Sequence, residues 1–207
     1  MQEKIMIQGP VGSLEGILAC PADNSVVQSI AVICHPHPLH SGTMQNKVVH
    51  YIAKTLNEMG MASLRFNFRG VGDSEGDYAE GQGETDDLLA TLGFMRARYP
   101  DAKVVLAGFS FGAYVALRAS TKAAVEQLIL VAPPVHLFDF TQLSLPNCPC
   151  LLIQGEVDEI VSCQDVLIWA QGCHPLPNIV VLPEASHFFH GCLNLLRTIL
   201  LENLSEQ

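Results

Sequence analysis

The chain has 207 residues, of which 49% are hydrophobic and 15% are charged. This composition excludes intrinsic disorder and predicts one globular domain spanning residues 1–207, because a chain of this length can bury a full core. The formal net charge is −10 and lysines and arginines form no cluster, which argues against a nucleic-acid partner. No apolar run approaches the roughly 18 residues of a membrane helix, so we expect no membrane partner.

Cysteine usage and the first residues bear on the cellular compartment. Seven cysteines, an odd number in a chain with an adequate core, are typical of reduced thiols inside a cell. The opening MQEKIMIQGP contains no apolar stretch of the kind found in secretory signals. We therefore expect a cytoplasmic protein.

In the first half of the chain, short apolar runs predict strands and amphipathic patterns predict helices. Gly9, Pro10 and Gly12 separate the two strands of an expected hairpin at the edge of a sheet. Leu88, Leu92, Met95 and Tyr99 recur at helical spacing, in a helix that ends before Pro100. Strands are predicted at about 3–9, 13–19, 29–34 and 61–68, and another helix at about 45–59.

The acidic segment 73–87 precedes and enters the helix of Leu88. It carries seven carboxylates in 15 residues. We interpret it as a solvated loop leading into a helix whose acidic start suits the helix dipole. A surface for a partner or substrate is the alternative.

The second half continues the alternation. Strands are predicted at 103–107, 127–132, 150–154 and 178–182, and helices at 111–122, about 161–172 and about 188–204. Repeated strand–helix–strand order is typical of the α/β class, with a mostly parallel sheet covered by helices on both faces.

The pentapeptide GFSFG at 108–112 matches the G-x-S-x-G pattern of a nucleophile elbow, a sharp turn between strand and helix that presents a serine hydroxyl. Ser110 comes just after the apolar strand KVVLA and precedes AYVALRAS, a good start for a helix. Glycines at both ends relieve the crowding of so tight a turn. Ser110 is therefore the predicted nucleophile, and a plain turn serine is the alternative.

A second match to the same pattern, GDSEG at 72–76, shows that the pentapeptide alone does not identify the nucleophile. The DYAEGQG stretch that follows it has no helical pattern. Carboxylates also flank Ser74 on both sides, and they would oppose a developing oxyanion. We interpret Ser74 as a loop serine.

A serine hydroxyl needs a base, and the base needs a third group to orient it. In folds that carry this elbow the chain order is serine, acid, histidine, each on a loop after a strand. His187, in the loop PEASH after the strand NIVVL, is the predicted base, and Asp158, in the loop GEVDEIV after CLLIQ, is the predicted acid. His190 is expected inside the last helix. The rival candidates are His190, Glu156, Glu159 and Asp165.

Backbone N–H groups are expected to stabilise the oxyanion of the reaction. The first is that of Phe111, the residue after the nucleophile, at a helix start. The second should come from the loop HPHPLH at 35–40, after the third strand. The two prolines of this loop have no N–H, so His37 or Leu39 must supply the group, and we favour His37.

The same loop carries His35, His37 and His40, which invites a metal interpretation. No C-x-x-C or H-E-x-x-H spacing accompanies them, and prolines that stiffen a turn explain the loop without an ion. We therefore expect no metal and no cofactor.

Three stretches carry a family resemblance: HPHPLHSGTMQNKVV at 35–49, LRFNFRGVGDSEG at 64–76 and GETDDL at 83–88. With the elbow, they resemble the alpha/beta-hydrolase superfamily, and in detail a group of small lidless bacterial predicted hydrolases related to dienelactone hydrolase. The resemblance implies a three-layer sandwich around an eight-stranded, mostly parallel sheet, with Ser110, Asp158 and His187 as a catalytic triad. Dienelactone hydrolases place a cysteine at the nucleophile position, so Ser110 argues against dienelactone specificity.

Many such relatives insert a lid between the strands predicted here at 127–132 and 150–154. This chain has only about 17 residues there, four of them prolines, which cannot make a cap domain. An open site of this kind suits a small or a protruding acyl substrate.

Together these features predict a serine hydrolase that cleaves a small carboxylic ester or thioester through an acyl-enzyme, with a small-molecule acyl compound as its substrate. One alternative is a catalytically silent scaffold that binds a partner or ligand. Another is an acyltransferase or peptidase that uses the same triad. Acyl length, leaving group and oligomeric state are not predicted.

Overall fold

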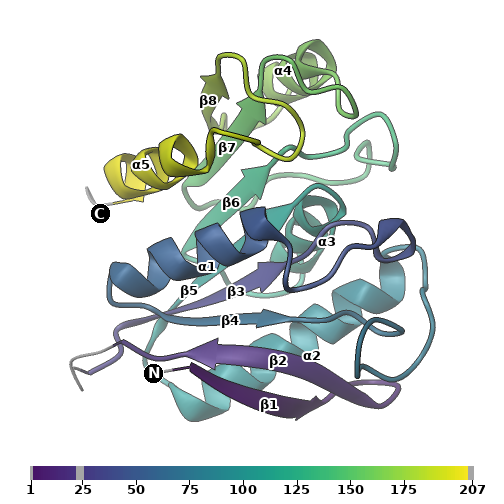
Figure 1. Ribbon diagram of the computed structural model, residues 1–207, viewed down its shortest axis with the longest axis vertical. Coiled ribbons are helices and arrows are strands. Elements are labelled where there is room, and N and C mark those ends of the chain that lie inside the picture. Colours follow the sequence, from purple (N-terminus) through teal and green to yellow (C-terminus); the bar gives the residue numbers. More distant parts are fainter. Residues whose placement is uncertain (1, 22–25, 205–207) are drawn as a thin grey trace.

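The protein is described by a computed structural model over residues 2–21 and 26–204, in which eight strands form one sheet (Figure 1). The strand order is β1-β2-β4-β3-β5-β6-β7-β8. β1 pairs with β2 and β2 with β4 antiparallel, whereas all later neighbours are parallel. The strands are β1 (Gln2–Gln8), β2 (Ser13–Ala19), β3 (Ser29–Cys34), β4 (Ala62–Phe66), β5 (Lys103–Phe109), β6 (Gln127–Val131), β7 (Cys150–Gly155) and β8 (Asn178–Leu182). The predicted mostly parallel sheet is confirmed.

Helices cover both faces of this sheet (Figure 1). Within β3, Ile30 and Val32 face α2 and α3, whereas Ala31 and Ile33 face α1 and α5. Both sets are fully buried, which explains why the strands are apolar throughout and do not alternate with polar residues. The helices are α1 (Lys47–Glu58), α2 (Gln82–Arg98), α3 (Phe111–Ser120), α4 (Cys163–Gln171) and α5 (Leu193–Leu204), with a short 3₁₀ helix, η1 (Pro38–His40).

Helix α1 has a well-defined beginning and end. The side-chain oxygen of Asn46 accepts a hydrogen bond from the Val48 N–H, an amide that the helix itself leaves free. Beyond its last turn, Gly60 adopts φ +89°, a left-handed conformation that glycine takes without strain. Asn46 is thereby fixed beside the loop that carries η1.

The last helix begins later than the sequence predicts. Phe189 has φ 53° and Gly191 has φ 76°, and a right-handed helix cannot pass through two such residues. Helix α5 therefore starts at Leu193, and His190 lies exposed in the loop before it. The prediction that His190 lies inside the last helix is wrong.

The acidic segment 73–87 is only partly solvated. Five of its carboxylates are exposed, but Glu84 and Asp87 are completely buried. The two oxygens of Glu84 accept the backbone N–H groups of Ala79 and Gly81, while Asp87 forms an ion pair with Arg69 at 2.6 Å. The interpretation as a solvated segment is therefore wrong for these two acids: Glu84 binds amides of the same segment, and Asp87 binds Arg69 in the loop after β4.

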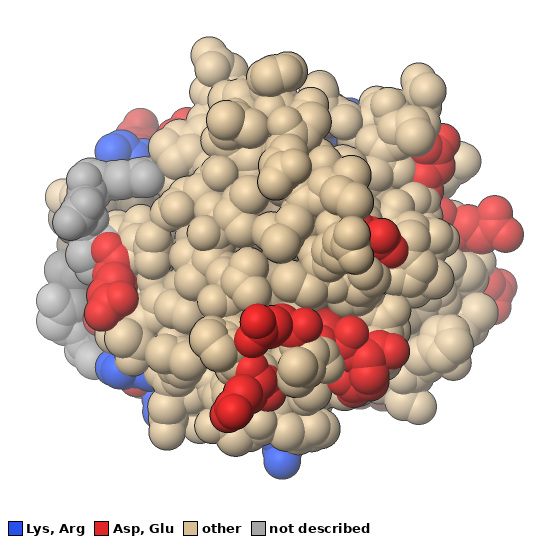
Figure 2. All heavy atoms as spheres, turned by 90° about the horizontal axis from the view of Figure 1, so that it is seen from above, with Lys and Arg blue, Asp and Glu red and all other residues tan. Residues whose placement is uncertain are grey.

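The surface is poor in positive charge on the face seen in Figure 2. Acidic side chains gather there in a patch, whereas lysines and arginines lie only near its edge. In the described part of the chain, no helix has both the length and the apolar character needed to cross a membrane.

Candidate active site

Ser110 occupies a strained turn between β5 and α3. Its φ of 54° and ψ of −122° are rare for a residue with a side chain, and such strain is concentrated at functional sites. A Cβ atom on Gly108 would collide with the carbonyl of Gly112, and one on Gly112 with the carbonyl of Cys34. Both glycines of the pentapeptide are thus required by backbone contacts, and the turn sets the hydroxyl at the carboxyl edge of the sheet.

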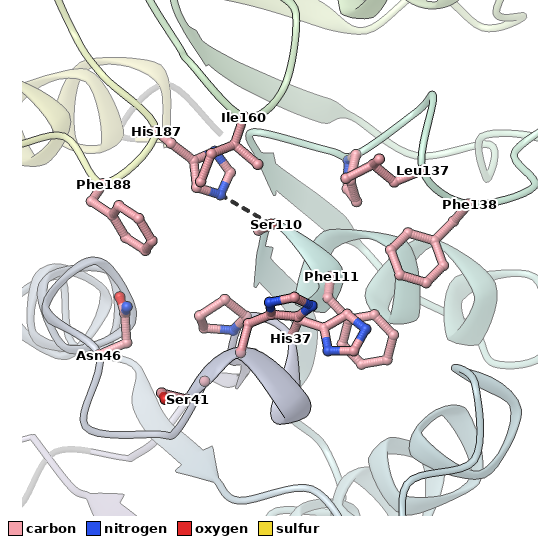
Figure 3. A pocket seen from close by; sticks show the side chains of 14 residues that line it. His37, Ser41, Asn46, Ser110, Phe111, Leu137, Phe138, Ile160, His187 and Phe188 are labelled. Atoms are coloured by element: carbon pink, nitrogen blue, oxygen red, sulfur yellow. Dashed lines mark hydrogen bonds between the residues drawn. The ribbon is translucent and has the colours of Figure 1, made fainter.

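The loops after β7 and β8 bring the predicted acid and histidine to this serine (Figure 3 shows the histidine and serine). His187 Nε2 lies 3.1 Å from Ser110 Oγ, and His187 Nδ1 lies 2.8 Å from Asp158 Oδ2. The side chains of His187 and Asp158 are 3% and 0% exposed, so water does not compete for this contact. Because Nδ1 donates to a carboxylate, Nε2 is left to accept the proton of the serine hydroxyl.

Asp158 is held by four hydrogen-bond donors. Its Oδ1 accepts the N–H groups of Ile160 and Val161, and its Oδ2 accepts His187 Nδ1 and the side-chain amide of Gln154 at 3.1 Å. Burial alone raises the pKa of the Asp158 carboxyl, but the hydrogen bonds from His187 and the loop amides outweigh it and lower the pKa. Asp158 is therefore ionised at neutral pH.

Glu159, considered above only as a rival acid, has a different position. Its Oε2 accepts a hydrogen bond from the backbone N–H of His187 at 3.1 Å. Glu156 and Asp165 are exposed and make no such contact within the described residues. Adjacency to Asp158 was the only sequence signal for Glu159, and it cannot reveal a contact with a loop 28 residues away.

The backbone N–H groups of Phe111 and His37 have no acceptor in the described part of the chain. The Leu39 N–H, the alternative to that of His37, already donates to His37 Nδ1 at 3.2 Å. Both Phe111 and His37 line the same cavity as Ser110. This arrangement favours His37 over Leu39 as the second expected donor to an oxyanion.

The His37 side chain is fixed by its neighbours. Its Nε2 lies 3.2 Å from the Tyr78 hydroxyl, and its ring packs 5.0 Å from the rings of both Tyr78 and Phe111. Burial, and secondarily His40, lowers the pKa of His37, so the ring is neutral, with Nδ1 accepting from Leu39 and Nε2 donating to Tyr78. Tyr78, which the sequence analysis did not single out, thus ties the acidic segment to the loop of His37.

His35 and Ser74 serve the scaffold. His35 Nε2 accepts the Phe68 N–H at 3.1 Å, and Nδ1 donates to the Pro36 carbonyl. Burial lowers the pKa of His35 to about 4. Ser74 lies in a loop, as predicted, and its buried hydroxyl bridges two backbone segments. Among the described residues no three His, Cys, Asp or Glu side chains gather in a way that would hold a metal ion.

A cavity of about 350 Å³ opens above Ser110 (Figure 3). Part of its wall comes from residues 132–149 between β6 and β7, a segment that contains no helix or strand. The cavity is lined by Pro36, His37, His40, Ser41, Gly42, Asn46, Ser110, Phe111, Pro134, Leu137, Phe138, Ile160, His187 and Phe188. Its lining is mainly apolar and aromatic, as in pockets that hold small organic ligands.

Comparison with known proteins finds similar chains over nearly the whole length of this one. An alpha/beta serine hydrolase without a lid from Xanthomonas campestris is 41% identical, with a TM-score of 0.94 over 99% of this chain and 94% of that one. An alpha/beta serine hydrolase homologue from Coxiella burnetii is 45% identical, with a TM-score of 0.93 over 98% of this chain and 97% of that one. An uncharacterized protein of Rickettsia prowazekii (strain Madrid E) is 36% identical over 90% of this chain and 82% of its own length.

Residues 27–141, more than half of the chain, match the family model described as serine aminopeptidase, S33. The predicted resemblance to small lidless alpha/beta hydrolases is confirmed, while a specific relation to dienelactone hydrolases stays a prediction. The chain belongs to the serine aminopeptidase S33 family, with the fold of the lidless alpha/beta serine hydrolases.

Proposed function

We propose that this protein hydrolyses small carboxylic esters or thioesters through an acyl-enzyme formed on Ser110. The observation that carries the proposal is the unbroken chain of contacts from Ser110 Oγ through the His187 ring to the buried carboxylate of Asp158. Such a relay has one evident use, which is to remove the hydroxyl proton as the oxygen attacks a carbonyl carbon.

In the proposed reaction, Ser110 Oγ bonds to the carbonyl carbon while His187 Nε2 takes the hydroxyl proton. The N–H groups of Phe111 and His37 stabilise the resulting oxyanion, and Asp158 stabilises the imidazolium. The intermediate collapses, the bond to the leaving oxygen or sulfur breaks, and His187 returns its proton to the leaving group. Water then attacks the acyl-enzyme with His187 again as base, which releases the acid and restores Ser110.

The experiment that tests this mechanism is acid quenching during turnover of p-nitrophenyl butyrate, followed by peptide mass spectrometry. We expect a butyryl group on the peptide that contains Ser110, preceded by a burst of p-nitrophenol if deacylation is the slow step. Hydroxylamine, added as a competing acceptor, should take the butyryl group from the acyl-enzyme as a hydroxamate. Turnover that gives neither an adduct on Ser110 at any quench time nor an enzyme-dependent hydroxamate would contradict the proposal. Labelling by a fluorophosphonate distinguishes an active serine from a silent scaffold.

Aminopeptidase activity is the second candidate, because the family description names it. An aminopeptidase must bind the free ammonium group of its substrate, and burying that charge calls for a carboxylate partner. None of the residues that line the cavity is Asp or Glu. We therefore expect p-nitrophenyl butyrate to be cleaved much faster than leucine p-nitroanilide, and the opposite order would favour the peptidase.

A further inference from the structure

The cavity above Ser110 is adapted to an uncharged occupant. It contains no Lys, Arg, Asp or Glu among its lining residues, so a charged group inside it would lack an ionic partner. The pKa of His37, which lines it, is lowered chiefly by burial, so this ring also carries no charge at neutral pH.

The lining differs between the two sides of Ser110 (Figure 3). On one side, Leu137 and Phe138 present only carbon to the cavity, and we call this the apolar side. On the other side, beside Phe188, Ser41 and Asn46 bring a hydroxyl and an amide, and we call this the polar side. A substrate that spans Ser110 therefore meets the carbon of Leu137 and Phe138 at one end and the polar groups of Ser41 and Asn46 at the other.

The amide of Asn46 has a fixed orientation. Its Oδ1 is committed to capping α1, accepting the Val48 N–H at 2.9 Å. The amide nitrogen is left with two N–H donors that have no acceptor within the described part of the chain. The Ser41 hydroxyl likewise has no partner there and is exposed. The polar side thus offers donors held in place by a cap that α1 needs for its own start.

We propose that the preferred substrate is an uncharged ester with an apolar acyl group and an alcohol that carries a carbonyl or similar acceptor, which Asn46 recognises through its side-chain N–H. This inference rests on the proposed ester hydrolysis. The acyl group remains bound through both chemical steps and is stabilised by packing against the apolar side. The alcohol leaves after the first step, past the exposed Ser41.

The test compares two butyrate esters whose alcohols have the same shape. In the 2-oxopropyl ester the alcohol carries C=O, and in the 2-methylallyl ester C=CH₂ takes its place. Asn46→Asp keeps the capping oxygen but replaces the donors with an acceptor oxygen. We expect the ratio of kcat/KM for the oxo ester to that for the allyl ester to fall about tenfold relative to wild type. Intrinsic ester reactivity and the fraction of folded protein cancel in this ratio.

Lys47→Ala is the matched control, because Lys47 is the exposed neighbour of Asn46 and does not line the cavity. This variant should keep the wild-type ratio. An unchanged ratio in Asn46→Asp would overturn the inference. A second pair, propyl 4-oxopentanoate and propyl 4-methylpent-4-enoate, carries the same two groups on the acyl side. A change in the ratio for this second pair alone would also overturn the inference. If Ser110→Ala still hydrolysed these esters, the proposed function itself would fail, which is a separate result.

Discussion

Glu159 accepts a hydrogen bond from the backbone N–H of His187, while its neighbour Asp158 accepts one from the ring of the same histidine. Two consecutive acids thus hold one residue at two points, its backbone and its ring. Glu159→Ala should lower kcat about tenfold with little change in KM, because the loop of His187 loses an anchor.

Glu159→Gln keeps an acceptor oxygen and should restore most of the activity. Glu156→Ala removes a comparable exposed acid from the same loop and serves as the control. Steady-state kinetics on p-nitrophenyl butyrate checks all three variants. Equal losses in Glu159→Gln and Glu159→Ala would show that the hydrogen bond to His187 is not what matters.

Neighbouring acids of α2 should differ sharply in their effect on stability. Asp87 is completely buried against Arg69, whereas Asp86 lies 3.9 Å from Lys122 with both side chains about half exposed. Asp87→Ala leaves a buried guanidinium unpaired and should lower the free energy of unfolding by about 3–5 kcal/mol. Asp86→Ala should lower it by less than about 1 kcal/mol. Urea denaturation measures the free energy of unfolding of both variants. Similar losses in the two would contradict the conclusion that the buried pair of Asp87 with Arg69 matters more to stability than the exposed contact of Asp86 with Lys122.

The buried ring of His35 makes stability depend on pH. Because burial lowers the pKa of His35 from 6.5 to about 4, the unfolded chain binds a proton in this range and the folded protein does not. The contribution of neutral His35 to the free energy of unfolding is complete above pH 6.5, and it declines by about 3 kcal/mol as the pH falls to 4. The lowered pKa of the Asp158 carboxyl acts in a separate window, because its contribution is lost only as the pH falls below 3.8.

Urea denaturation of wild type and His35→Gln at pH 7, 5.5 and 4 checks this prediction. The amide of glutamine does not titrate, so the variant should lose much less stability across this range than the wild type. Parallel losses in the two proteins would assign the pH dependence to other groups.

Ser110, Asp158 and His187 could be located from sequence because Ser110 directly follows an apolar strand and the other two lie in the loops just after apolar strands. Parallel strands end at one edge of the sheet, so strand recognition alone brings the three loops together. The elbow also has a local signal, since its two glycines are dictated by backbone contacts within and beside the turn. Strand and turn patterns in the sequence therefore predict most of the fold and the main candidate residues of the site.

Other features depend on contacts between distant segments. Asp87 looks like any acid at a helix start, and its burial follows only from Arg69, which arrives from another loop. The start of α5 depends on Phe189 adopting a positive φ, which no residue propensity favours. Likewise, the contacts of Tyr78 with His37 and of Glu159 with His187 join loops whose meeting a single sequence does not reveal.

The central claim is that Ser110 and His187 act as one nucleophilic unit, and turnover of p-nitrophenyl butyrate by Ser110→Ala, His187→Ala and the double variant tests it most directly. We expect each single variant to lose about 10⁴- to 10⁶-fold in kcat, and the double variant to lose no more than either single one. Circular dichroism confirms that the variants are folded. A folded Ser110→Ala protein that retains wild-type turnover would contradict the account.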